Sequence, residues 1–427
     1  MTIKRREFLN ITTKATVATG LFTSLSACGN TTTEVEKSNE EAVEFENMVN
    51  DLQPISTEER QKRVAKAQEL MRAQSIEALI LDSGTSLEYF TGISWWPSER
   101  TMVAIIPANS EVFYICPAFE EDRFREMVTI GNEVLVWQED ESPFQLIVKT
   151  FNDLNISSGK IALENSLRFF IMDGIRKESS QLEFVSDTVA KHCRIIKSPA
   201  ELALMQRAFD ITTEAIKHAI SQLKEGMSQR ELSGIIANAH REMGASHDFA
   251  LVLFGVSSSF PHGSKVPQTL KKGDVVLMDC GCRVHGYSSD ITRTVVFGEP
   301  TSKQSEIWNL EKQAQEAGFE AAQLGATCGS IDAASRKVII DAGFGPDYKL
   351  PGLPHRTGHG IGMDGHEFPY AVKNNPQVLE SGMCFSIEPT IAIPGEFGIR
   401  LEDCVYMTEN GPKWFTKTAT AIDKPFG

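Results

Sequence analysis

HRTGHGIGMDGHE, residues 355–367, holds three of the nine histidines of the chain. His355 and His359 have the four-residue spacing of a helical zinc pair, but the interspersed glycines disfavour a continuous helix. We therefore expect a loop or strand end that presents one imidazole to a metal ion and keeps others, such as His366, nearby for proton transfer. A chance grouping of surface histidines is the alternative, and acidic residues elsewhere in the chain decide between the two.

Four of these acidic residues stand at the ends of apolar, strand-like runs. They are Asp279 in VVLMD, Asp290 in SDITR, Glu388 in MCFSIE and Glu402 in GIRLE. Asp279 and Asp290 are eleven residues apart. Glycines at positions 281 and 286, with His285 between them, predict a turn, so the two aspartates can face each other from paired strands.

A carboxylate at the end of an apolar strand is costly unless it is paired or bound to a cation. Arg293 and Arg400 could balance part of the charge as structural ion pairs, which is the alternative to a metal site. Two arginines against four acids leave a deficit, which two divalent ions about 3.5–4 Å apart would remove. Four carboxylates with one imidazole favour Mn²⁺ over Zn²⁺.

The length and charge of the chain limit the classes of protein to which it can belong. A chain of 427 residues is expected to form about two domains. Its hydrophobic content of 41% and charged content of 23% are typical of a globular protein. The net charge of −15 argues against nucleic acid as a partner, because an acidic body repels phosphate.

Residues 1–27 are interpreted as an export signal. Arg5 and Arg6 with a following apolar run resemble a twin-arginine signal, and LSAC, ending at Cys28, resembles a lipobox. An uncleaved amphipathic helix is the alternative. The acidic residues 28–55 are expected to form a tether. The protein is thus expected on the periplasmic side of a bacterial membrane as a lipoprotein, with membrane contact only through lipidated Cys28.

The seven remaining cysteines have no regular spacing and do not form a disulfide framework. Cys280 and Cys282 lack a second pair at zinc-site spacing. They are therefore interpreted as strand residues.

Two folded domains are expected. An α/β domain over residues 56–194 begins with a helix from Thr57. Its strands are expected near 78–81, 102–107, 112–116, 134–137 and 161–163. In the loop SWWPSER, Trp95 and Trp96 are interpreted as caps on the core of this domain. The alternative is that they and Arg100 reach a neighbouring subunit.

The second domain, residues 195–427, opens at IKSPAEL, where Ser198 is the predicted N-cap and Pro199 the first helical residue. A capping box is also predicted at Ser228 and Glu231. Helices are expected over about 199–223, 228–243, 302–324 and 329–342. Strands are expected around 249–255, 274–283, 289–297 and 383–407.

These motifs together resemble the pita-bread metallohydrolases, which include methionine aminopeptidase, aminopeptidase P, prolidase and creatinase. The resemblance rests on five residues in order, within DITRT, GHGIG, SIEP and RLED: Asp279, Asp290, His359, Glu388 and Glu402. It covers about residues 197–420, and the preceding domain resembles the N-terminal domain of creatinase and the Xaa-Pro peptidases. It implies an α+β fold in which a pita-bread catalytic domain follows a smaller α/β domain.

The resemblance also implies roles for the residues. Asp290 and Glu402 would bridge two divalent ions, Asp279 would bind one, and His359 with Glu388 would bind the other. The ions would be Mn²⁺, with Co²⁺ and Zn²⁺ as alternatives. Glu388 would act as general base on a metal-bridging hydroxide.

Further residues of the site follow from the same resemblance. His262, in PHGS, and His366 match two histidines that steady the tetrahedral intermediate and pass protons to the leaving amine. His355 matches a further histidine of the family. Arg400 is expected either to bind substrate or to balance charge at the metals.

The implied reaction is hydrolysis of the Xaa-Pro bond in small peptides with proline at the second position, by a homodimeric enzyme. Prolidases carry an arginine between the metal histidine and the first metal glutamate to grip the carboxylate of proline. Residues 367–387 contain no arginine, and Lys373 is the only cation among them. Dipeptidase and aminopeptidase P activity therefore stay open. A second hypothesis is a creatinase-like or ectoine-hydrolase-like hydrolase of a small amide, and a third is a non-catalytic, lipid-anchored binding protein.

Overall fold

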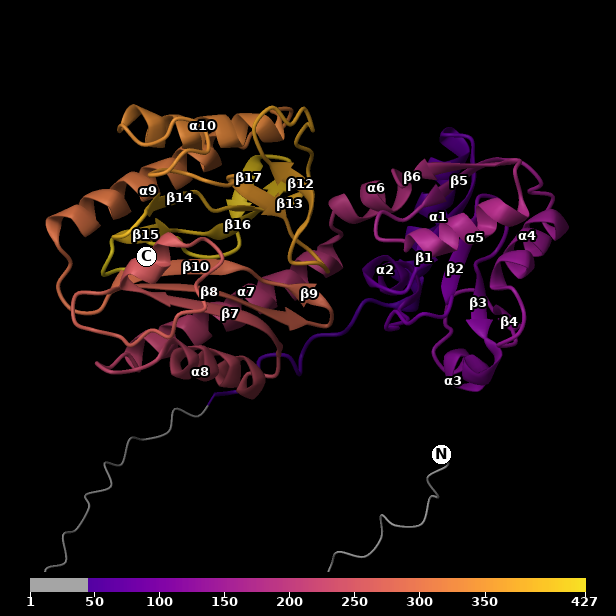
Figure 1. The fold of residues 1–427 in the computed structure, drawn as a ribbon, viewed down its shortest axis with the longest axis horizontal. Coiled ribbons are helices and arrows are strands. Elements are labelled where there is room, and N and C mark those ends of the chain that lie inside the picture. The colour runs from indigo at the N-terminus through magenta and orange to yellow at the C-terminus, as the bar shows by residue number, and fades with distance from the viewer. Residues whose placement is uncertain (1–44) are drawn as a thin grey trace, which may run out of the picture. The chain divides into compact units, whose positions relative to one another are not determined.

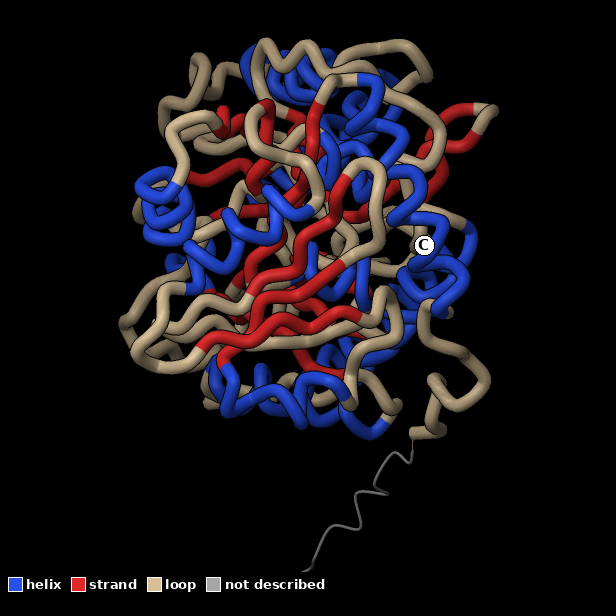
Figure 2. The backbone as a smooth tube through the Cα atoms, turned by 90° about the vertical axis from the view of Figure 1, so that its right-hand side faces the viewer, coloured by secondary structure: helices blue, strands red, loops and turns tan. Residues whose placement is uncertain are grey.

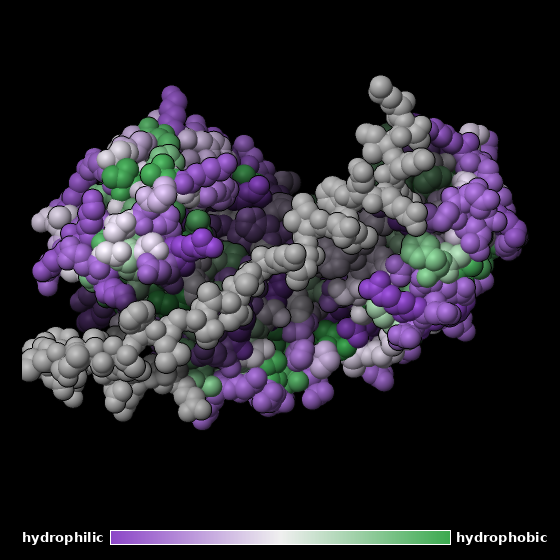
Figure 3. Space-filling view, turned by 60° about the horizontal axis from the view of Figure 1, so that its bottom comes forward, coloured by the Kyte–Doolittle hydropathy of each residue, from purple (hydrophilic) through white to green (hydrophobic). Residues whose placement is uncertain are grey.

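The computed structural model describes residues 45–427, so the expected signal and most of the expected tether lie outside the described residues. No helix within 45–427 combines the length and apolar character needed to cross a bilayer. The face of the molecule drawn in Figure 3 is mostly hydrophilic, with small hydrophobic areas between the polar side chains.

The N-terminal domain is built on one mixed six-stranded sheet, in the order β4-β3-β2-β1-β5-β6. The strands are β1 (Ile76–Asp82), β2 (Val103–Pro107), β3 (Phe113–Pro117), β4 (Glu133–Trp137), β5 (Gly159–Leu163) and β6 (Leu182–Ser186). The helices are α1 (Thr57–Ala73), α2 (Thr85–Thr91), α3 (Glu121–Arg125), α4 (Pro143–Asp153), α5 (Phe169–Glu178) and α6 (Val189–Ile195), with a 3-10 turn η1 (Ala118–Glu120). All five expected strands are present, and β6 is additional.

The middle of strand β1, residues 78–81, is apolar because both faces of the sheet are covered. Leu79 and Leu81 point into one hydrophobic cluster, whereas Ala78 and Ile80 point into the other. The alternation follows from the two-residue period of a strand. A continuous apolar run is the sequence pattern of such a doubly covered strand.

The C-terminal domain opens with two capped helices, as the sequence predicts. Helix α7 (Pro199–Ser221) begins with the capping box of Ser198 and Glu201, and α8 (Gln229–Glu242) with that of Ser228 and Glu231. The strands of this domain form three sheets: β10-β8-β7 with β9 on β8, β12-β11-β13-β16-β17, and β14-β15.

Figure 1 shows these strands between α8 on one side and α9 and α10 on the other, and Figure 2 shows the molecule from the side of the N-terminal domain, with helices around the strands. The bounds are β7 (Ser246–Phe254), η2 (Gly255–Ser259), β8 (Val275–Val284), β9 (Tyr287–Ser288), β10 (Ile291–Val296), α9 (Ser302–Ala321), α10 (Cys328–Asp341), β11 (Gly358–Gly360), β12 (Glu367–Ala371), β13 (Cys384–Ile387), β14 (Thr390–Ile393), β15 (Phe397–Arg400), β16 (Asp403–Thr408) and β17 (Gly411–Trp414).

The turn between the two aspartates is shorter than expected. His285 and Gly286 both have positive φ, 47° and 88°, and close the hairpin between β8 and β9. Gly281 is instead a strand residue of β8, where a Cβ would lie 2.3 Å from the carbonyl oxygen of Ser289. Cys280 and Cys282 are strand residues, as interpreted, and the seven cysteines within residues 45–427 are free.

The end of the expected tether is packed against the C-terminal domain. The backbone amide of Met48 donates to the carbonyl of Met243 at 2.9 Å, and Asp51 pairs with Arg207 at 2.7 Å. The ring of Phe45 packs edge-on against that of His218. The expectation of a free tether as far as residue 55 is therefore wrong for residues 45–55, because their apolar side chains find a surface to cover.

The two tryptophans differ in their surroundings. Trp95 packs against Phe124 at 5.5 Å between ring centroids, so its interpretation as a cap on the domain core holds. Trp96 is 87% exposed, and that interpretation is wrong for it. Arg100 pairs with Glu139 of the same domain at 2.8 Å.

Candidate metal centre

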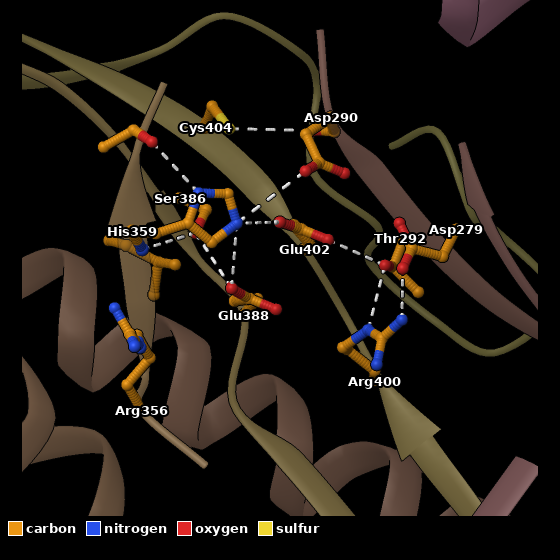
Figure 4. A network of polar contacts seen from close by, with 12 residues as sticks. Asp279, Asp290, Thr292, Arg356, His359, Ser386, Glu388, Arg400, Glu402 and Cys404 are labelled. Atoms are coloured by element: carbon orange, nitrogen blue, oxygen red, sulfur yellow. Dashed lines mark hydrogen bonds and ion pairs between the residues drawn. The ribbon is translucent and has the colours of Figure 1, made fainter. Parts of the chain in front are cut away.

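The five residues expected to bind metal lie together in the catalytic domain. Three overlapping groups have ligand atoms within 4.8 Å of one another: Asp279, Asp290 and Glu402; His359, Glu388 and Glu402; and Asp290, His359 and His366. Figure 4 shows the carboxylates of Asp290, Glu388 and Glu402 around the His359 ring, with Asp279 farther away beside Arg400. The Nε2 atom of His359 is 3.1 Å from Glu388 Oε1, 3.7 Å from Asp290 Oδ2 and 3.8 Å from Glu402 Oε1.

Strand pairing brings these residues together from distant parts of the chain. Strands β8 and β10 pair so that Thr292 faces Asp279, and Thr292 also bridges to Glu402. Strand β11, which carries His359, lies between β12 and β13, and Glu388 follows β13 directly. Each ligand thus comes from a strand or a strand end, which fixes its backbone.

The buried oxygen atoms of the centre fit a cation. Asp279 Oδ1, Asp290 Oδ1 and Glu402 Oε1 are buried and have no hydrogen-bond partner within the described residues. Buried carboxylate oxygens are normally paired, because leaving one without a partner costs several kcal/mol. Oxygen atoms from three side chains that point at one another without a donor are what a hard divalent ion requires.

The same crowding raises the pKa of two of the acids. Burial raises the pKa of Asp290 well above its usual value, and the charges of Glu402 and Asp279 raise it further. Burial likewise raises the pKa of Glu402, with Glu388 adding to the effect. Arg400 offsets these charges only in part, so the site favours further positive charge from outside.

Glu388 and His359 form an ion pair within the centre. Burial opposes the charge of Glu388, but the neighbouring His359 holds the pKa of Glu388 at about 2. Burial also opposes the charge of His359, but Glu388 raises the pKa of the imidazole. Ser386 Oγ donates to Glu388 at 3.2 Å and accepts from the His359 backbone amide at 3.0 Å, which orients both.

The two arginines have different roles. Arg400 is buried and its guanidinium donates to Asp279, to Thr292 Oγ1 at 3.1 Å and to the carbonyl of Pro261 at 3.1 Å. This arrangement favours charge balance over substrate binding. Arg293 points away from the centre and pairs with Asp403 at 2.7 Å. The alternative that Arg293 balances the ligand carboxylates is therefore wrong.

The three other histidines lie at different depths. His366 stacks on His359 with 3.7 Å between ring centroids, and burial followed by the charge of His359 lowers the pKa of His366 to about 4. His355 bonds through Nε2 to Thr390 Oγ1 at 2.9 Å, and burial lowers its pKa. His262 is exposed and follows Pro261, whose carbonyl accepts from Arg400.

Several residues of the centre were not anticipated from the sequence. Thr292 donates to Glu402 Oε2 at 2.8 Å, and its place two residues after Asp290 on one strand could have indicated a shared face. Ser386 stands two residues before Glu388 in the same way. Arg356, drawn in Figure 4 beside the centre, lies over the ring of Tyr370 at 4.4 Å. Its position in the sequence, between His355 and His359, could have indicated that it lies near the centre.

The loop that carries His366 is held by the N-terminal domain. Asp364 accepts from Thr85 Oγ1 at 2.6 Å and from Arg194 at 2.6 Å. Arg194 also pairs with Glu367, which in turn accepts from Lys197. Because Asp364 and Glu367 flank His366, these ion pairs restrict the backbone that positions its imidazole.

The fold and the acid-rich centre define a metal-dependent hydrolase. Residues 203–409 match the metallopeptidase family M24, and residues 63–196 match the creatinase/prolidase N-terminal domain. The chain belongs to metallopeptidase family M24 and has the two-domain, pita-bread architecture of the Xaa-Pro peptidases, as the sequence motifs indicated.

Individual relatives agree with this family. An Xaa-Pro dipeptidase of Lactobacillus delbrueckii subsp. lactis is 33% identical over 84% of this chain and 97% of the relative. An uncharacterised peptidase of Schizosaccharomyces pombe is 35% identical over 85% of this chain and 82% of the relative. The crystal structure of the dipeptidase PepE from Mycobacterium ulcerans superposes with a TM-score of 0.79 at 29% identity, covering 85% of this chain and 97% of that chain.

Proposed function

We propose that this metallopeptidase hydrolyses the Xaa-Pro bond of short peptides with two divalent ions, preferably Mn²⁺, held by the five candidate ligands. The observation that carries the proposal is the set of buried, unpartnered oxygens of Asp279, Asp290 and Glu402 around His359. The similarity to an Xaa-Pro dipeptidase supports the substrate class. The oxygen-rich ligand set supports a hard ion.

When bound, two divalent ions would supply Lewis acidity for the scissile carbonyl and lower the pKa of a water molecule. Asp290 and Glu402 would serve both ions, because each shares one ligand group with Asp279 and another with His359, whereas Asp279 and His359 share none. The ionised carboxylate of Glu388 is placed to accept a proton from the attacking water. Ser386 keeps that carboxylate oriented.

The leaving nitrogen of an Xaa-Pro bond has no hydrogen, so it must be protonated as the bond breaks. His366 stacks on the candidate ligand His359 and is neutral near pH 7, because its pKa lies at about 4. A neutral imidazole donates one hydrogen bond and accepts another. His366 can therefore donate toward the developing charge, with His262 and His355 completing the histidine set.

A substrate panel on metal-loaded protein tests this proposal. Ala-Pro, Ala-Pro-Ala, Ala-Ala and N-acetylated amino-acid amides are compared, with the Glu388→Gln variant as inactive control. Cleavage confined to the bond before proline is expected. Turnover of the acetylated amides without turnover of either proline peptide would favour a small-amide hydrolase and contradict the proposal.

We also propose that the protein is exported as a lipoprotein anchored at Cys28 and forms a homodimer. The support for the anchor is the arginine pair and lipobox-like run within residues 1–28. Membrane fractionation of wild type and Cys28→Ala tests the anchor, and light scattering tests the dimer. Recovery of full-length wild type in the cytosol, with Met1 present, would contradict export.

A further inference from the structure

An aromatic surface extends the candidate metal centre along β12. His359 of β11 faces Tyr370 of β12, and cross-strand partners point to the same side of a sheet. Phe368 lies two residues before Tyr370 and therefore on the same face. Both are half-buried, whereas Glu367, Pro369 and Ala371 between and beside them are buried. The ring centroids of Phe368 and Tyr370 are 5.0 Å apart.

A cationic side chain lies over each of these two rings. The Lys191 ammonium, from α6, lies 4.0 Å from the centroid of the Phe368 ring. The Arg356 guanidinium lies 4.4 Å from the centroid of the Tyr370 ring. Within residues 45–427 neither charged group has an ion pair or a hydrogen bond, unlike Arg194 and Lys197, which both pair with Glu367. We call Lys191, Arg356, Phe368 and Tyr370 the cationic platform.

The cationic platform borders a cavity beside the candidate centre. The cavity has a volume of about 610 Å³ and is lined by His366, Lys191, Phe368 and Tyr370, among other residues. Arg356 lies over the Tyr370 ring from the side of the centre, and Figure 4 shows it near Glu388 and His359. The platform thus connects the cavity to the place where the peptide bond would be cleaved.

Three of the six acids that line this cavity pair with cations outside the platform, and burial raises the pKa of the other three, Glu88, Glu164 and Asp187. Asp82 pairs with Arg168 at 2.7 Å, and Asp364 pairs with Arg194 at 2.6 Å. Lys191 also lines the cavity, and within residues 45–427 it has no ion pair. A cation that is stacked on an aromatic ring keeps its hydrogen-bond donors free for a ligand.

We propose that the cationic platform binds a carboxylate of the substrate. This inference rests on the proposed Xaa-Pro peptidase function and specifies which peptides it accepts. Residues 367–387 offer no arginine for a substrate carboxylate, and the one cation there, Lys373, is already paired with Asp347. Arg356 and Lys191 are the free cations beside the centre, and charge-assisted bonds to carboxylates are the strongest that they make.

The carboxylate can come from the C-terminus of a dipeptide or from an acidic side chain before proline. Two substrate pairs separate these sources. Ala-Pro against Ala-Pro amide isolates the C-terminal carboxylate. Asp-Pro amide against Asn-Pro amide isolates the side chain. Steady-state kinetics of wild type, Arg356→Gln and Lys191→Gln are measured on both pairs with metal-loaded protein.

In one of the two substrate pairs, we expect wild type to have the higher kcat/KM for the charged member. We expect this preference to fall at least tenfold in Arg356→Gln and in Lys191→Gln. The change should lie in KM, because the platform contacts the substrate away from the reacting atoms. A loss confined to the first pair assigns the C-terminus, and a loss confined to the second assigns the side chain. Unchanged preferences in both pairs would overturn the proposal.

Two further variants separate charge from folding. Lys413→Gln removes an exposed lysine whose ammonium lies 5.6 Å from the centroid of the Tyr406 ring, and it should alter neither preference. Arg356→Lys keeps the charge and should retain part of the preference. If Arg356→Lys and Arg356→Gln lose the preference equally, carboxylate binding depends on the two-pronged guanidinium group and not on charge alone. A loss of preference in Lys413→Gln would overturn the assignment.

A binding measurement separates this inference from the proposed function. An Ala-Pro analogue with a reduced peptide bond cannot be cleaved, and calorimetry compares its acid with its amide. If wild type hydrolyses no Xaa-Pro peptide yet binds the acid more tightly through Arg356, the proposed function fails and the platform stands. If Xaa-Pro peptides are cleaved and Arg356→Gln binds the acid and the amide in the wild-type ratio, the platform fails alone.

Discussion

The carboxylates of the candidate metal centre repel one another inside the protein. Asp290 and Glu402 are buried, and their nearest charged neighbours include further acids. Arg400 is committed to Asp279, and Glu388 is paired with His359. A bound cation therefore stabilises the folded state as well as enabling the reaction.

Asp290→Ala and Glu402→Ala should each lose bound metal and reduce kcat by about 10³-fold or more, as expected when a main electrostatic contribution is removed. Metal analysis and peptide hydrolysis measure the two effects. Glu396→Ala, which removes an exposed partner of Lys303, should change neither. Two ions still bound per chain in either ligand variant would contradict the dinuclear arrangement.

Chelation should lower the unfolding temperature of wild type, since ligand bound at 1,000 times its Kd contributes about 4 kcal/mol. In chelator, the double variant Asp290→Asn, Glu402→Gln should unfold at a higher temperature than wild type, because it removes the repulsion. Thermal unfolding with and without chelator measures this. If the double variant unfolded at a lower temperature than wild type in chelator, repulsion between Asp290 and Glu402 would not destabilise the metal-free protein.

His366→Ala should keep the metal ions but lower kcat by about 10²–10⁴-fold, the usual range for proton transfer. The His366 ring can also reach a common point with Asp290 and His359, so metal content is the decisive measurement. Loss of an ion from His366→Ala would make His366 a ligand. His262→Ala provides a comparison at an exposed histidine of the same set.

At the residue scale the sequence predicts the ligands well, because each stands in a short motif next to an apolar strand. The partners of these ligands are less predictable. Arg293 and Arg400 look equivalent in the sequence, yet alternation along their strands turns Arg293 toward Asp403 and Arg400 toward Asp279. That distinction depends on the strand register, which the motifs do not contain.

A pair of histidines, the buried His240 and the half-buried His247, joins helix α8 to strand β7. His240 Nδ1 is 3.0 Å from His247 Nδ1, and His240 Nε2 is 3.3 Å from Thr212 Oγ1. Burial, with the charges of His247 and Arg241, lowers the pKa of His240 to about 3. The side chain is therefore neutral in the folded protein and packs the helix against the sheet without a charge.

This pair should make the folded state sensitive to acid. Between pH 6.5, the ordinary pKa of histidine, and about 3, the unfolded chain binds a proton at His240 that the folded chain does not. Stability should thus fall on acidification, by at most about 1.4 kcal/mol per pH unit. His240→Asn should flatten this dependence in denaturant unfolding. His285→Asn, at an exposed turn, should leave it unchanged.

Elements with local signals were predicted within a few residues. The capping boxes at Ser198 and Ser228 mark the starts of α7 and α8 directly. Strand β6 was missed because LEFVS is short and only Leu182 within it is fully buried. The packing of residues 45–55 was missed because an acidic segment with scattered apolar residues looks alike whether it is free or docked.

The two domains are joined by a buried ionic cluster as well as by the chain. Arg194 lies at the end of the N-terminal domain and pairs with Asp364 and Glu367 of the catalytic domain. The residues are about 170 positions apart. No motif in the sequence relates them, so the cluster could only be found in the structure.

Arg194→Gln should reduce the free energy of unfolding by about 3 kcal/mol, because it leaves the buried Glu367 with only Lys197 and leaves Asp364 without its cation. It should also lower kcat, since the loop of His366 loses an anchor. Chemical denaturation and kinetics measure these effects. Arg176→Gln, at an exposed pair with Asp173, should change neither. If Arg194→Gln were as stable as wild type, the ionic cluster would not contribute to the stability of the domain contact.

This shared cluster limits how halves of related enzymes can be exchanged. A chimera that joins this catalytic domain to another enzyme's N-terminal domain would inherit Asp364 and Glu367 but not Thr85 or Arg194. The His366 loop would then carry two acids without their donors. Recombination between such enzymes should therefore succeed only where the crossover moves these four residues together, so that the N-terminal half is inherited as part of the active site.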